Sequence, residues 1–235
     1  MAINEMEPTN GNTRKAHRGV IERLLTILVD PGSIFKDIIE KPDFMGPMTI
    51  IVITAALSMP STAYTLQQIP EMAPGQAQNI PINVTASAII GSISSLIALA
   101  IWWPIRAAIF LGIGNIFKAK LDFKQSLAVS GYLNYPSLLS GLVSAITIWS
   151  AGRPVTPGLG MALSFSELST PRGVLLSNLN IFALMYIFLS VFGLSELWRI
   201  SRAKGLIATI IMWSAVLGIQ VAIAGLTAGL RGIAQ

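Results

Sequence analysis

Cysteine is absent from the 235-residue chain, and charged residues make up only 11% of it. The lack of cysteine excludes disulfides, thiolate metal sites and cysteine nucleophiles. The single histidine, His17, stands in a polar N-terminal segment, so no apolar segment offers a histidine ligand or a Ser–His pair. We therefore predict no catalytic residue, no cofactor-binding residue and no metal ligand, and we predict that the protein is not an enzyme.

Carboxylates are missing from every long apolar stretch of the sequence. A transporter that couples its cycle to protons or sodium needs such groups inside the membrane, so their absence weakens that class. The sequence also lacks a glycine-rich loop followed by Lys and Ser or Thr, which leaves a nucleotide site unsupported.

Hydrophobic residues make up 53% of the chain, and the mean hydropathy is +0.66. Charged residues make up about 25% of a typical soluble domain, against 11% of this chain. The composition therefore indicates an all-α, multi-pass integral membrane protein. The formal charge of +5 at pH 7 fits anionic lipid headgroups, because the basic residues flank apolar segments. We do not expect nucleic-acid binding.

Five apolar stretches are long enough to span a bilayer, which needs about 20 helical residues. The segment Phe117–Trp149 is central, because a basic loop runs directly into a span that carries no charge between Lys124 and Arg153. The second span is long, with a crossing portion at Ala86–Trp103 and a continuation bent at Pro104. The predicted spans are Met48–Ala63, Ala86–Phe117, Gln125–Trp149, Val174–Gly193 and Gly205–Leu230.

Basic residues orient these five spans. Lys and Arg stay on the cytoplasmic side because they resist translocation. Of the 16 Lys and Arg residues, only Arg153, Arg172 and Arg231 fall in the segments predicted to lie outside. This asymmetry predicts the N-terminus inside and the C-terminus outside. The candidate cytoplasmic contacts for lipid or a partner are Lys118, Lys120, Lys124, Arg199, Arg202 and Lys204.

The N-terminal region divides into two parts ahead of the membrane domain. Residues 1–17 are polar and mixed in charge, and we predict a disordered cytoplasmic tail. Residues 18–43 carry two amphipathic helical patterns, the second capped by Asp30-Pro31. These helices either pack on the cytoplasmic ends of the spans or lie in the headgroup layer. Residues 44–235 form the five-helix transmembrane domain.

Arg106 and the broken third span supply the polar groups that we consider as a candidate ligand site. We expect Arg106 to snorkel to the inner interface, since a charge in mid-membrane is costly. Gly131 and Pro136 deform the third span, and the simplest interpretation is a kinked, tightly packed helix. If a ligand site exists within the membrane, its candidate residues are Arg106, Tyr132 and Asn134, with Pro136 beside them.

Two short motifs resemble the Yip family, the Ypt/Rab-interacting membrane proteins. Asp43-Phe44-Met45-Gly46-Pro47 is similar to the family's acidic–apolar–x–Gly–Pro signature, with Asp43, Gly46 and Pro47 at its defined positions. The segment from Gly131 and Tyr132 to Pro136 is similar to its Gly-Tyr-x-x-x-Pro signature. The basic stretch Ser195–Gly205 and the proline-flanked helix before the first span resemble its prokaryotic branch, which would place the protein in the cell membrane.

The resemblance implies a five-span, N-in Yip-type protein without enzymatic activity. Eukaryotic relatives engage small GTPases of the Rab type and form homo- or hetero-oligomers in membrane traffic, so a GTPase and a second membrane protein are partners implied by resemblance. Two function classes follow. The first is a non-catalytic membrane organiser or adaptor that contacts anionic headgroups and partners through its basic face. The alternative is a small transporter or lipid-translocating protein with a polar pocket between the second and third spans.

Overall fold

The computed structural model describes residues 19–72, 83–155, 157–164 and 166–233, and within these ranges the chain is helical and forms no β-strand. The predicted all-α fold is confirmed, and the predicted tail at residues 1–17 lies outside the described residues. The elements are α1 (Val20–Thr26), α2 (Pro31–Glu40), α3 (Met45–Met72), α4 (Val84–Ile116), α5 (Phe123–Tyr132), α6 (Tyr135–Ala151), η1 (Leu159–Ala162), η2 (Glu167–Ser169), α7 (Pro171–Asn178), α8 (Ile181–Trp198) and α9 (Arg202–Ile233).

Four of these helices are long and apolar enough to cross a membrane. They are α3, over Met45–Gln68, and α4, α8 and α9, the last over Arg202–Gly229. The sequence predicted five spans, and the fifth candidate is the predicted third span, which is two helices here. The count of five and the orientation of the termini therefore stay predictions.

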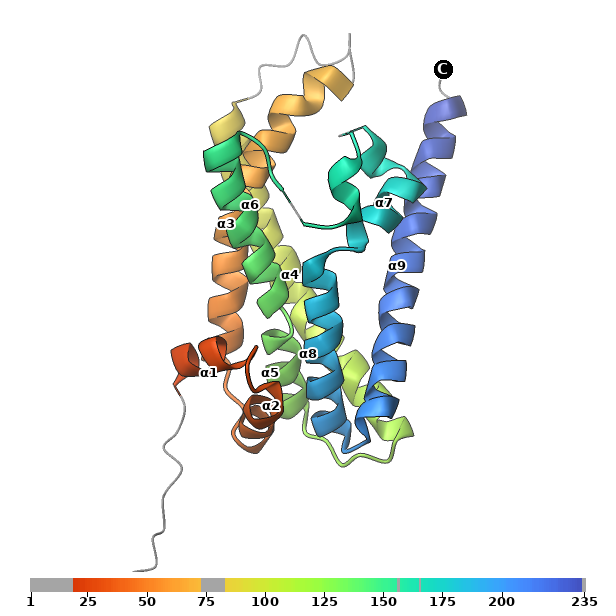
Figure 1. Ribbon diagram of the computed structural model, residues 1–235. Helices are drawn as coiled ribbons and strands as arrows, with labels where there is room; N and C mark the ends of the chain where they lie inside the picture. The colour runs from red at the N-terminus through yellow and green to blue at the C-terminus, as the bar shows by residue number, and fades with distance from the viewer. Residues whose placement is uncertain (1–18, 73–82, 156, 165, 234–235) are drawn as a thin grey trace, which may run out of the picture.

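The predicted third span is broken between α5 and α6 at Leu133–Asn134. Pro136 has no amide hydrogen, so the helical hydrogen bond back to Tyr132 cannot form. The Asn134 amide turns to the nearer carbonyl of Gly131, at 3.0 Å. The two helices still follow one another along the bundle (Figure 1).

Helix α3 is longer than the sequence predicted. We expected the span to end near Ala63, but the helix continues to Met72. A proline removes only one helical hydrogen bond, and Pro60 does not end α3. Helix α4 likewise contains Pro104 and runs as one helix from Val84 to Ile116.

The predicted fourth span was wrong at both ends. It was placed at Val174–Gly193, whereas α7 ends at Asn178 and α8 begins at Ile181. Asn180 sets this boundary, because its side-chain oxygen accepts the amides of Phe182 and Ala183, each at 2.9 Å. At the other end, the residues expected in a cytoplasmic loop continue the helix, and Trp198 is buried.

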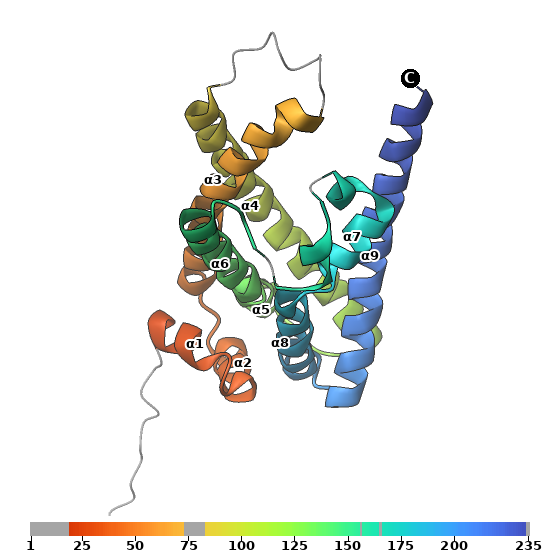
Figure 2. The same cartoon turned by 45° about the horizontal axis from the view of Figure 1, so that its top comes forward.

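The helices are arranged as a bundle with the two described ends of the chain at opposite ends of it (Figure 1). Helices α1 and α2 lie at one end, beside the connections from α4 to α5 and from α8 to α9. Figure 2 shows α7 lying against α9, apart from α3 and α6. We call the end that carries α2 the packed end, because α2, α5 and α8 meet there around fully buried side chains.

The two N-terminal helices differ in how much apolar surface they bury. Helix α2 packs on the ends of the spans: Ile34, Phe35 and Ile38 are completely buried, and the predicted Asp30 cap accepts the Ser33 amide at 3.2 Å. Helix α1 keeps much of its apolar surface open, with Ile21 75% and Leu25 71% exposed. A position of α1 in the headgroup layer stays a prediction.

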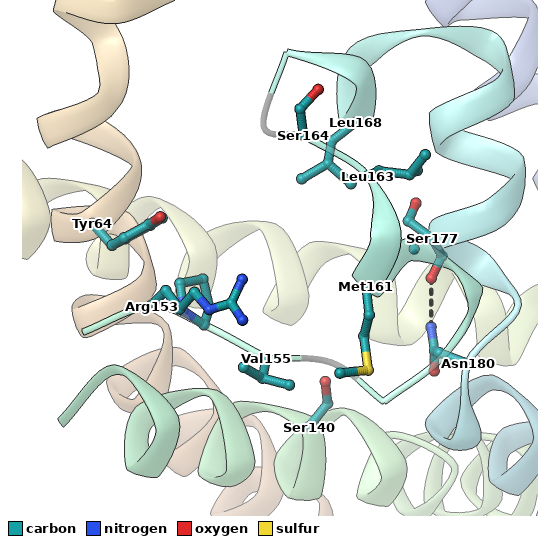
Figure 3. Close-up of a pocket in the computed structure, with 12 residues that line it drawn as sticks. Tyr64, Ser140, Arg153, Val155, Met161, Leu163, Ser164, Leu168, Ser177 and Asn180 are labelled. Atoms are coloured by element: carbon teal, nitrogen blue, oxygen red, sulfur yellow. Dashed lines mark hydrogen bonds between the residues drawn. The ribbon is translucent and has the colours of Figure 1, made fainter. Parts of the chain in front are cut away.

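A cavity of about 550 Å³ lies at the other end of the bundle. It opens between α3, α6, the connection after α6 and the junction of α7 with α8 (Figure 3). The short helix η1 contributes Gly160 and Met161 to its wall.

Candidate functional site

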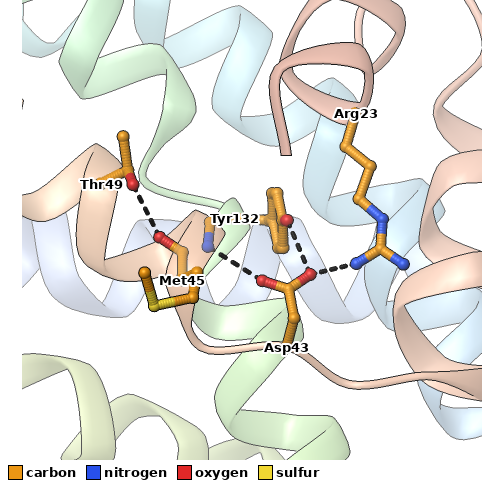
Figure 4. Close-up of polar contacts among 6 residues, drawn as sticks. Arg23, Asp43, Met45, Thr49 and Tyr132 are labelled. Atoms are coloured by element: carbon orange, nitrogen blue, oxygen red, sulfur yellow. Dashed lines mark hydrogen bonds and ion pairs between the residues drawn. The ribbon is translucent and has the colours of Figure 1, made fainter. Parts of the chain in front are cut away.

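The Asp43 carboxylate is the meeting point of three helices at the packed end (Figure 4). Its Oδ1 accepts the Gly46 amide at 2.9 Å, and its Oδ2 accepts the Tyr132 hydroxyl at 2.9 Å. The Arg23 guanidinium forms an ion pair with Oδ2. We call Arg23, Asp43, Gly46 and Tyr132 the Asp43 cluster.

The local sequence explains why each member of the Asp43 cluster points inward. Asp43 stands just before α3, where a carboxylate accepts an amide of the first turn that has no helical partner. Tyr132 is the last residue of α5 and is fully buried. Arg23 is only 3% exposed, although its place opposite the apolar residues of α1 indicated a solvated position. The ion pair thus fastens α1 to α3 and α5.

Two glycines allow the two motif segments to touch. A Cβ added to Gly46 would stand 2.0 Å from the Tyr132 hydroxyl oxygen, and one added to Gly131 would stand 2.3 Å from the Pro47 Cβ. Neither position has room for any side chain. The residues that carried the family resemblance, which are 89 positions apart at Asp43 and Tyr132, therefore lie against one another.

Helix α4 is bonded to the backbone of α5 near its break. The Trp103 indole donates to the Leu127 carbonyl at 2.7 Å, and the Arg106 guanidinium donates to the Ser130 carbonyl. In an unbroken helix the Asn134 amide would donate to the Ser130 carbonyl. Here that amide donates to Gly131, which leaves the Ser130 carbonyl available to Arg106. The break in the third span thus supplies the acceptor that holds the charge of Arg106.

The predicted snorkelling of Arg106 was wrong. The residue is 9% exposed and faces the interior of the bundle. A buried backbone carbonyl offers a guanidinium a partner inside the bundle, which removes the need to reach the interface.

The candidate cluster of Arg106, Tyr132 and Asn134 is not held together by shared contacts. Tyr132 bonds to Asp43, and Arg106 bonds to Ser130. Asn134 lies at the break and is 7% exposed, and Pro136 is buried in the first turn of α6. The three polar groups therefore do not converge on one ligand, and their role in binding stays untested.

Most of the basic residues proposed to contact lipid or a partner are open to solvent. The exposed ones are Lys118, Lys120, Lys124, Arg199 and Lys204. Arg202 differs, because its guanidinium bonds to Glu196 at 2.5 Å and to the Phe192 carbonyl at 2.8 Å, and lies 4.4 Å from the Phe192 ring centroid. Arg202 thus fastens α9 to α8, which the sequence did not reveal.

The described residues contain no group of three or more His, Asp or Glu side chains placed to hold a metal ion. Sequence analysis missed Arg23 and Trp103, which tie helices together in this site. The sequence offered one sign that Arg23 could pair with Asp43, because Arg23 is a cation on a short helix that precedes the acidic motif. Trp103 was predicted only to end the crossing portion of the second span, and the sequence does not indicate its bond to the Leu127 carbonyl.

Comparison with known proteins agrees with this architecture. A family model described as the Yip1 domain matches residues 25–224. The chain is also 27% identical over 126 residues to an uncharacterized protein of Methanocaldococcus jannaschii, which covers 53% of this chain and 87% of that protein. No solved structure matches the chain. The family match runs from α1 into α9 and includes both segments that meet at Asp43, and we conclude that this membrane protein belongs to the Yip1 domain family.

Proposed function

We propose that this Yip1-family protein is a non-enzymatic membrane organiser or adaptor that acts through its packed end. One observation carries the proposal: basic side chains that face solvent and apolar side chains of α1 gather at that end, while the polar motif residues bond to one another. Groups already paired within the fold hold helices in place. Exposed cations and apolar side chains are the groups available for binding.

Anionic headgroups are the first partner that this surface suits. Lys118, Lys120 and Arg199 stand in the connections between helices at the end that carries α1. Each Lys or Arg near an anionic membrane surface contributes about 1 kcal/mol of attraction. Helix α1 adds exposed apolar side chains for the boundary between headgroups and acyl chains.

A protein partner would meet the same surface. Family resemblance suggests a small GTPase or a second membrane protein, including another copy of this chain. A second copy could also be met away from the packed end, since the Gly225–Gly229 segment near the far end of α9 has the GxxxG spacing that permits close helix contact. These partners remain proposals that rest on family membership.

The transporter alternative would need free polar groups between the second and third spans. Of its three candidate residues, Arg106 bonds to the Ser130 carbonyl and Tyr132 bonds to Asp43. A transport site there would have to break these contacts or use other residues.

The proposed function is tested by crosslinking in the native membrane, followed by gentle purification and identification of bound proteins and lipids. A variant neutralised at Lys118, Lys120 and Arg199 removes exposed charge and leaves the contacts of Arg202 in place. Its control is neutralised at Arg172, toward the opposite end, which takes no part in the packed end. We expect a specific partner, or enrichment of anionic lipid, to be lost in the first variant and kept in the control.

Equal recovery from both variants would contradict a role for the packed end. Transport of a solute or lipid by the purified protein in liposomes would contradict the non-transporting role, provided that Arg106→Ala abolishes it. Each variant is first compared with the parent protein for helicity and thermal unfolding, so that loss of folding is not mistaken for loss of binding.

A further inference from the structure

The cavity at the end opposite α2 has walls that are fixed on both sides. Residues 152–155 and 157–162 form a strap that leaves α6 and reaches the junction of α7 and α8 (Figure 3). At its start, the Val155 amide donates to the Thr147 hydroxyl at 3.0 Å. At its far end, the Leu159 amide donates to Leu179 at 3.1 Å, and the Ile181 amide donates to Pro157 at 3.0 Å.

Glycines bring the strap into direct contact with the junction. A Cβ added to Gly158 would stand 2.6 Å from the Asn180 Cα, and one added to Gly160 would stand 2.8 Å from the Ser177 Cα. The backbones therefore touch without intervening side chains, and the cavity lies beside this seam. A volume of about 550 Å³ falls within the usual range of small-molecule sites.

The lining combines apolar side chains and uncharged polar side chains with one cation. Val155, Met161, Leu163 and Leu168 supply apolar surface. Arg153 is the only charged residue among the lining residues. Figure 3 shows the Arg153 guanidinium and the Tyr64 hydroxyl on the same side of the cavity.

The acidic residue of this region is already engaged. Glu167 accepts the Ser164 hydroxyl at 2.6 Å and the Ser164 amide at 2.8 Å, and these bonds lower the pKa of its carboxyl. It therefore stays ionised at neutral pH, bound to Ser164. Among the residues that the structure describes, Arg153 pairs with no carboxylate.

We propose that this cavity binds an anionic amphiphile, with its acidic headgroup at Arg153 and its aliphatic chain against Met161, Leu163 and Val155. A guanidinium donates paired hydrogen bonds to a carboxylate or a phosphate, and the apolar lining excludes water from the chain. A free fatty acid and an anionic phospholipid share this chemistry. The site uses none of the basic residues of the packed end, so it stands independently of the proposed function.

The test measures binding of cis-parinaric acid, a fluorescent fatty acid, to the full-length protein in nonionic detergent, with its methyl ester as the uncharged probe. We expect the acid to bind more tightly than the ester. Arg153→Gln removes a charge-assisted hydrogen bond, so we expect it to weaken binding of the acid about tenfold and leave the ester unchanged. Arg172→Gln is the matched control and should change neither. Met161→Trp fills the cavity and should weaken both probes.

Competition identifies the source of the headgroup. Displacement of the probe by oleate alone supports a fatty-acid site, and displacement by phosphatidylglycerol as well supports a phospholipid site. Equal affinity of the acid and the ester in the parent protein would overturn the proposal. An unchanged affinity in Arg153→Gln, or displacement by neither competitor, would overturn it as well. Arg153→Lys keeps the charge and should recover most of the affinity, which separates charge loss from misfolding.

Discussion

The packed end and the long helices α4 and α9 differ in how far their apolar side chains are buried within the protein. At the packed end, large apolar side chains such as Phe35 and Trp198 are almost completely removed from solvent. Along α4 and α9, residues of equal hydrophobicity remain open, with Ile97 54% and Ile219 61% exposed. The difference teaches that apolar sequence alone does not mark a core in a membrane protein, since lipid can cover the second group.

The polar contacts follow the same division. The Asp43 cluster and the contacts of Trp198 and Arg202 all join helices at the packed end. The Trp198 indole, for example, donates to the Phe110 carbonyl at 2.9 Å and ties α8 to α4. A side chain from this end should therefore contribute much more to stability than an equally apolar one from the open surfaces.

Phe35→Ala should produce the largest effect. Removing this completely buried ring leaves a cavity between α2 and α8, where Phe35 lies against Gly193. We expect a loss of about 3–5 kcal/mol in the free energy of unfolding, measured by denaturant titration in mixed micelles. Ile219→Ala on the exposed surface of α9 is the control, and we expect it to change stability by less than about 0.5 kcal/mol. Equal losses would remove the distinction between the two regions.

Gly46→Ala should have an intermediate effect. The new methyl group would overlap the Tyr132 hydroxyl, so α3 and α5 must move apart at a cost of about 1–3 kcal/mol. Gly218→Ala is the matched control, because nothing lies within 4 Å of a Cβ built there. That change should be neutral or stabilising in thermal unfolding, since alanine favours helix more than glycine does. A neutral Gly46→Ala would show that the motif glycine is not required for this approach.

Tyr132→Phe should have the smallest effect of the three. It removes the hydrogen bond to Asp43 and keeps the buried ring, so we expect a loss of about 0.5–1.5 kcal/mol. The same substitution combined with Asp43→Ala should cost less than the sum of the single losses, because the two residues contact each other. Strictly additive losses would mean that the hydroxyl and the carboxylate contribute separately.

Several features of this fold follow from the sequence because they are local. The apolar stretches, the helical periodicity before the first span and the Asp30 cap each depend on residues within a few positions of one another. The break at Leu133–Asn134 belongs to the same class, since Pro136 cannot donate the hydrogen bond that would link it to Tyr132 four residues earlier. The same local reasoning failed at α7 and α8, where Asn180 starts a new helix inside a continuous apolar pattern.

The candidate site was less predictable. The motif residues were found by resemblance, but the pattern did not indicate that Asp43 and Tyr132 bond to each other or that Arg23 joins them. Arg106 was predicted at the interface because burying a charge is costly. The prediction did not include the Ser130 carbonyl, which the broken α5 offers as an acceptor inside the bundle. Arg106 reaches this carbonyl only because α5 packs against α4, and the sequence does not indicate that contact.

By itself, the sequence determined that this protein is helical, membrane-embedded and poor in catalytic groups, because composition and short-range pattern decide which surfaces can leave water. Tertiary structure decided which apolar residues form a core and which cations become internal partners. The physical reason is distance along the chain. A hydrogen bond between residues 89 positions apart exists only where packing brings two helices together, and no local preference of either segment specifies that approach.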